Sequence, residues 1–95
     1  MIDLNELLNR TVDIKIKDKT IKVKDITVKQ FERMLDIEKE GTVKDQANLI
    51  AEILSNNTNN IKFTTEQVEK MSRPAVVYLW QLFVTKSLDT AIDPN

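Results

Sequence analysis

The chain has 95 residues, which predicts a single domain spanning residues 1–95. Hydrophobic residues make up 41% of the chain and charged residues 31%, and the formal charge is −1. This composition is typical of a folded globular protein, and the balanced charge excludes a general attraction to nucleic acid or to anionic membranes.

The residue types that are missing narrow the function further. The chain has no cysteine and no histidine, so it lacks thiolate nucleophiles, thiolate metal ligands and the commonest general base. Its one glycine, Gly41, excludes a glycine-rich phosphate loop. We therefore expect no enzyme activity, no catalytic residue, no cofactor and no metal.

The hydropathy pattern gives an expectation for location. The first ten residues, MIDLNELLNR, lack the basic and long apolar regions of a signal peptide. The longest apolar run, residues 75–83, is far shorter than the roughly 20 residues that cross a bilayer. We expect a cytoplasmic protein without membrane association.

The N-terminal segment predicts a short amphipathic helix over residues 2–9. Asp3 is a candidate N-cap, and Ile2 before it is placed to pack on Leu7 as a hydrophobic staple. Leu4, Leu7 and Leu8 share one face of this helix.

Residues 11–25 alternate between apolar and polar side chains, which predicts a β-hairpin. The apolar side of the alternation holds Val12, Ile14, Ile16, Ile21 and Val23. A two-residue turn at Asp18 and Lys19 would place Ile16 opposite Ile21, but the turn lacks the Asn-Gly or Asp-Gly that favours positive φ, so a longer loop and another register stay open. Because a lone two-stranded hairpin is marginal in water, its apolar face either lies on helices or joins a sheet from another copy.

Two helices are expected after the hairpin. Thr27 and Gln30 have the spacing of a capping box before a helix over residues 28–40, which Gly41 ends. Thr42, with an acidic residue three positions later, begins the next helix.

Two more helices are expected after a polar loop at residues 56–60. Thr64 and Gln67 repeat the capping-box spacing and predict a short helix that ends near Met71. The last helix is expected over residues 72–91. The predicted fold class is α+β, mainly α, with the N-terminal β-hairpin at residues 11–25 packed on a small bundle of four to five helices. Residues 27–92 are the helical part.

Two groups of charged residues are candidates for chemistry. Asp36 and Glu40 lie four apart on one helical face, but no nucleophile or phosphate loop accompanies them, which favours a solvated helix face. Six lysines cluster on and after the hairpin, without the aromatic or arginine neighbours of a single-strand nucleic-acid surface. These are Lys15, Lys17, Lys19, Lys22, Lys24 and Lys29. We interpret them as a solvated face and expect no specific nucleic-acid binding.

The last helix carries the clearest indication of a contact surface. A core-facing side is predicted by a stripe of Val76, Trp80, Phe83, Val84 and Ala91, flanked by Val77 and Leu79. Tyr78 and Leu82 fall on the far side of the helix, among polar residues. A helix that is apolar on two sides packs either on a second helix of its own chain or on a partner. The candidate partner-binding residues are Tyr78, Leu82 and Trp80.

The order of these parts resembles a known family. A charged hairpin, VDIKIKDKTIKVKDI, precedes a helix that begins ITVKQFERML, and the chain closes on an apolar helix that begins SRPAVVYLWQLF. Over residues 10–90 this is similar to the small tail assembly chaperones of long-tailed phages and prophages of low-GC Gram-positive bacteria. The resemblance implies a non-enzymatic, self-associating protein of the bacterial host cytoplasm. It would coat the tape-measure protein and assist polymerisation of the tail-tube protein.

Two other functions stay open at this point. One is a structural or adaptor protein that remains in a phage or prophage assembly. The other is a small nucleic-acid-binding regulator that uses the lysine-rich hairpin, although the neutral charge and the absence of a helix-turn-helix pattern argue against it.

Overall fold

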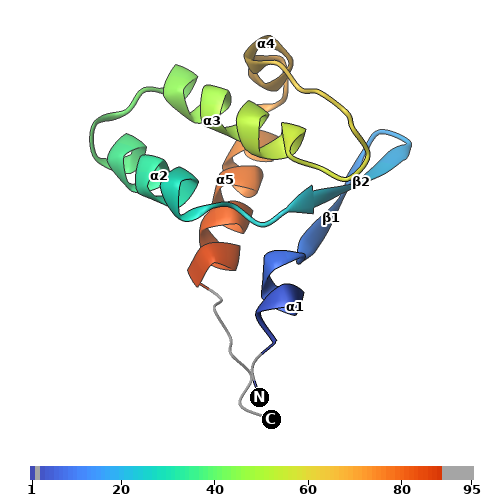
Figure 1. Ribbon diagram of the computed structural model, residues 1–95. Helices are drawn as coiled ribbons and strands as arrows, with labels where there is room; N and C mark the ends of the chain where they lie inside the picture. The colour runs from blue at the N-terminus through green and yellow to red at the C-terminus, as the bar shows by residue number, and fades with distance from the viewer. Residues whose placement is uncertain (2, 89–95) are drawn as a thin grey trace.

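The computed structural model describes residue 1 and residues 3–88 of the chain (Figure 1). In chain order the elements are α1 (Leu4–Leu8), β1 (Thr11–Ile16), β2 (Lys19–Lys24), α2 (Val28–Glu40), α3 (Val43–Ser55), α4 (Thr65–Glu69) and α5 (Arg73–Leu88). This order confirms the predicted α+β, mainly α, fold with an N-terminal hairpin. Ile2 and the expected helix end near residue 91 lie outside the described residues.

Capping boxes begin three of the helices, as the sequence predicts. In each box a threonine hydroxyl accepts a hydrogen bond from the backbone N–H three residues later, and that residue's side chain accepts one from the threonine N–H. The pairs are Thr27 with Gln30, Thr42 with Asp45, and Thr64 with Gln67. These local bonds satisfy backbone donors that a helix start leaves without partners, which explains why the helix starts are predictable.

Gly41 ends α2 through a close approach and not through a left-handed conformation. Its φ is −80°, which any residue adopts. A Cβ at this position, however, would lie 2.5 Å from Cγ2 and 2.7 Å from Cα of Ile37. Glycine is therefore needed here because the chain turns back tightly over the last turn of α2.

The hairpin forms where predicted, but its register differs from the expectation. The two-residue loop is Lys17 and Asp18, so Ile16 faces Lys19 and not Ile21. The expected register would have set Lys15 opposite Lys22, and like charges directly opposite destabilise a sheet.

The observed register removes that repulsion. Lys15 faces Thr20, while Asp13 faces Lys22 and pairs with it at 3.5 Å. The alternating pattern is the same in both registers, so the apolar face is unchanged. In the observed register, Lys17 of the loop has a φ of 55°, which is backbone strain in the left-handed region that favours glycine.

The core is one cluster of buried apolar side chains centred on α3. This helix packs against α2, α4, α5 and β2, and Leu49, Ile50 and Leu54 are completely buried. From the hairpin, Ile21 and Val23 join the same cluster. The apolar face of the hairpin therefore lies on the helices, which is the first of the two arrangements expected.

The loop after α3 closes the outer edge of β2. Its Thr58 N–H donates to the Lys22 carbonyl at 3.0 Å, and the Lys24 N–H donates to the Asn56 carbonyl at 2.9 Å. The Lys22 N–H also donates to Oδ1 of Asn59 at 2.9 Å. β2 is thus covered on both edges, by β1 and by this loop.

Candidate partner-binding groove

An open, mainly apolar groove of about 500 Å³ lies between β1 and the N-terminal half of α5. We call it the β1–α5 groove. Its apolar lining includes Ile14 and Ile16 from β1, and Ala75, Tyr78, Leu79 and Leu82 from α5. Asp13 and Lys15 add one charge of each sign at the strand side. Concave, apolar surfaces with a few polar groups are typical binding sites for partners.

The candidate residues of α5 separate into two groups. Tyr78 and Leu82 lie one helical turn apart and both line the groove, and Tyr78 is 57% exposed. Trp80 lies on the opposite side and is only 7% exposed. It is buried in the core, unlike Tyr78 and Leu82, with which it was predicted to bind a partner.

Trp80 also ties α5 to α2. Its indole Nε1–H donates a hydrogen bond to Oε1 of Glu38 at 3.0 Å. The apolar ring is thereby buried while its one polar group keeps a partner, which is the usual requirement for a buried tryptophan. The stripe predicted to face the core is confirmed, since Val76 and Phe83 are buried beside Trp80.

Sequence reasoning missed the β1 wall of the groove. Ile14 and Ile16 share the alternating pattern with Ile21 and Val23, which predicts equal burial. In the structure Ile21 and Val23 are 1% and 0% exposed, whereas Ile14 and Ile16 are only half-buried. The difference arises because β2 lies over α3 and β1 lies beside the groove, and no local sequence signal distinguishes the two strands.

Among the described residues, nothing hydrogen-bonds to the outer edge of β1 at Asp13. Lys22 and Lys24 direct their backbone groups away from β1, toward the loop after α3. In an antiparallel ladder, two directly opposed residues either both point their backbone N–H and C=O groups toward each other or both point them away from each other. Asp13 faces Lys22 and Thr11 faces Lys24, so the backbone groups of Asp13 and Thr11 point outward at the groove side of the strand.

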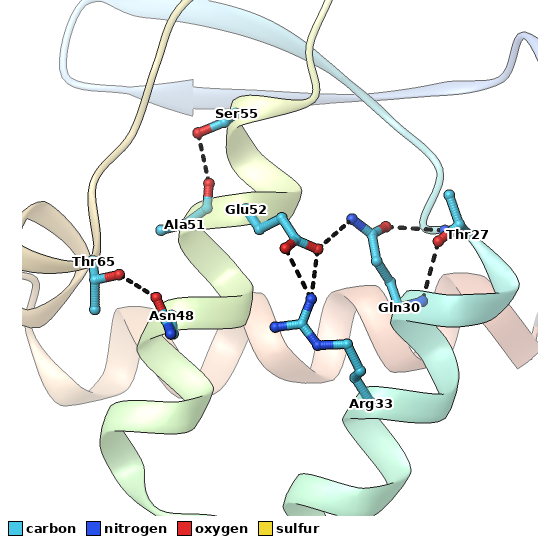
Figure 2. Close-up of polar contacts among 8 residues, drawn as sticks. All are labelled: Thr27, Gln30, Arg33, Asn48, Ala51, Glu52, Ser55 and Thr65. Carbon is cyan, nitrogen blue, oxygen red and sulfur yellow. Dashed lines mark hydrogen bonds and ion pairs between the residues drawn. The ribbon is translucent and has the colours of Figure 1, made fainter.

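A polar link joins α2 and α3 away from the groove (Figure 2). Glu52 accepts hydrogen bonds from Arg33 at 2.8 Å and from Nε2 of Gln30 at 3.0 Å. The Arg33 bond is the main reason, and the Gln30 bond the second, that the pKa of Glu52 lies below its ordinary value. Gln30 also completes the capping box with Thr27, so one side chain positions the start of α2 and its contact with α3.

The charged groups singled out in the sequence lie at the surface. Within residues 1 and 3–88, no group of three or more acidic, histidine or cysteine side chains is placed to hold a metal ion. Asp36 and Glu40 are exposed, and Glu38 is the acceptor for Trp80. The six lysines on and after the hairpin are also exposed.

The face of α1 is apolar as expected but does not reach the core. Leu4, Leu7 and Leu8 are 64%, 37% and 76% exposed, and none of the described residues of α1 is buried. Asp3 caps the helix by accepting from the Asn5 N–H at 2.9 Å.

Comparison with models of known protein families, with curated proteins and with solved structures gave no match. Among the helices of the described residues, none has the length and apolarity to cross a membrane.

Proposed function

We propose that this protein is a phage tail assembly chaperone that coats the tape-measure protein and assists polymerisation of the tail-tube protein. The observation that carries the proposal is the β1–α5 groove, an apolar surface left open in so small a protein. The order of hairpin and helices, which resembles that of such chaperones, supplies the identity of the client. The proposal includes no catalytic step, and it places the protein in the cytoplasm of the bacterial host.

The shape and chemistry of the groove suit a helical client. Ala75, Tyr78, Leu79 and Leu82 follow one another along α5 at helical spacing, so they present a continuous apolar strip. An amphipathic helix binds such a groove by burying residues at matching spacing. A long helical tape-measure protein would offer many such faces, which must be shielded from one another before the tail tube surrounds them.

The test of this proposal uses Leu82→Glu and a fragment of the tape-measure protein from the same phage. A carboxylate at Leu82 would be buried without a partner in the complex, so we expect affinity for the fragment to fall about tenfold or more. Stability should change by no more than about 1 kcal/mol, because Leu82 is half-buried at the groove. Co-expression with solubility assays and calorimetric titration give the two readouts, and circular dichroism melting gives the stability.

The matched control is Gln81→Glu, which adds the same charge to the exposed neighbouring position outside the groove lining. It should bind and solubilise the fragment as the unchanged protein does. Equal loss of affinity in both variants, or none in Leu82→Glu, would refute the groove as the client site. Mass spectrometry of purified tails separates the chaperone from a structural subunit, since only the subunit would be retained in finished particles.

A further inference from the structure

We infer that two copies of this protein pair edge to edge through β1, antiparallel, with Ile14 on the two-fold axis. The result is a four-stranded sheet in the order β2, β1, β1 of the second copy, β2 of the second copy. The inference does not depend on the proposed client, because it follows from the strand edge and is tested with the purified chain alone.

The two edges of the hairpin differ in their hydrogen bonding. The outer edge of β2 is bonded to the loop after α3, whereas no hydrogen bond between described residues satisfies the outward backbone groups of Asp13. An open edge of this kind is a template for another strand. The groove beside it leaves room for that strand, because α5 packs mainly on α2 and α3.

Backbone geometry limits the registers in which two β1 strands can pair. Only the odd-numbered residues of β1 direct their backbone groups outward, as the pairing of Asp13 with Lys22 shows. Two β1 strands must therefore oppose odd residues to odd residues to exchange hydrogen bonds. Placing Ile14 on the axis satisfies this requirement and sets Asp13 opposite Lys15 of the second copy.

The side-chain charges of Asp13 and Lys15 favour one register among those that the backbone permits. With Ile14 on the axis, each Asp13 faces a Lys15 of the other copy, so the contact has two attractive pairs. A shift of the register by two residues in one direction places Asp13 opposite Asp13 of the second copy. A shift in the other direction places Lys15 opposite Lys15 of the second copy. Opposite charges across strands stabilise a sheet, and like charges destabilise it. A lysine on a strand edge ordinarily discourages pairing, but here it has an aspartate to meet.

The same register also pairs the apolar side chains of the two β1 strands. In this register Ile14 meets Ile14 of the second copy, and Val12 meets Ile16. These are the half-buried apolar residues of β1. The strand of the second copy would cover them and fill the groove above Tyr78 and Leu82. A client helix would need the same space, so self-association should decrease as client is added.

The charge prediction is tested by sedimentation of the purified protein over a range of concentrations. We expect a monomer–dimer equilibrium whose dissociation constant rises about tenfold or more in Asp13→Lys and in Lys15→Asp. The double variant Asp13→Lys/Lys15→Asp restores both cross-strand pairs and should restore the dimer. Lys22→Gln is the matched control, since it removes only the ion pair with Asp13 within the chain and should leave the dimer unchanged.

The register is tested with single cysteines, because the natural chain has none. Residues on the axis of this pair have Cα atoms about 4.5 Å apart, within the range that a disulfide spans. Mild oxidation should therefore cross-link Ile14→Cys into a covalent dimer and leave Val12→Cys monomeric, because Val12 faces Ile16 of the second copy. Circular dichroism should show that both variants are folded.

Three results would overturn the inference. They are a protein that stays monomeric at all concentrations, a double charge variant that dimerises no better than the single ones, and a Val12→Cys variant that cross-links as fast as Ile14→Cys.

Discussion

Trp80→Ala is expected to lower the free energy of unfolding by about 3–5 kcal/mol, the usual range for truncating a buried tryptophan. The side chain is 7% exposed, within the cluster that joins α5 to α2 and α3. The change leaves a cavity and removes the hydrogen bond that the Trp80 indole donates to Glu38 of α2. A small domain has about 5–15 kcal/mol in total, so the loss removes a large share of the stability, and at the low end of that range much of the variant unfolds.

Urea denaturation followed by circular dichroism measures this loss, since the variant lacks the tryptophan signal. Tyr78→Ala is the matched control, because it truncates an aromatic residue of the same helix that is 57% exposed. We expect the control to lose less than about 1 kcal/mol. Similar losses in the two variants would mean that the groove side of α5 is as important for folding as the core side.

Asn57→Ala is expected to lower the free energy of unfolding by about 2–4 kcal/mol, although it changes a polar residue in a loop. Asn57 is 7% exposed, and its amide donates to the carbonyls of Leu54 and Ile61 at 2.7 and 2.8 Å. Its Oδ1 accepts from the backbone N–H groups of Asn59 and Ile61 at 3.0 and 3.1 Å. Alanine would leave these main-chain groups without partners.

Because this loop covers the outer edge of β2, the loss should also loosen the hairpin. Hydrogen exchange of the Lys22 and Lys24 amides should therefore be faster in Asn57→Ala. Thr58→Ala changes an exposed neighbouring side chain and should have almost no effect on stability or exchange. Unchanged exchange at Lys22 and Lys24 would show that the loop holds its shape without Asn57.

The elements that could be predicted from the sequence are those fixed by neighbouring residues. Each capping box joins residues three apart, so Thr27, Thr42 and Thr64 mark helix starts without knowledge of the rest of the fold. The alternation in the hairpin is likewise local. The core stripe of α5 follows from helical spacing alone, and the structure places Trp80 within it.

The features that could not be predicted depend on contacts between distant parts of the chain. The observed hairpin register differs from the two-residue turn considered from the sequence, and it sets Asp13 opposite Lys22, where the alternative would set Lys15 opposite Lys22. Asn57 looks like one of several equivalent asparagines, and only the fold shows that it is buried. The β1 wall of the groove was missed because Ile14 and Ile21 have the same local pattern and different surroundings.

The positions of the two largest aromatic side chains of α5 provide separate optical signals for folding and for binding. The chain has one tryptophan and one tyrosine, and they lie on opposite sides of the same helix. Emission from Trp80 therefore reports whether α5 is docked on α2 and α3. The near-ultraviolet signal of Tyr78 reports whether the groove is occupied. A client or second copy that fills the groove should change the tyrosine signal and leave the tryptophan emission maximum in place, whereas unfolding should change both.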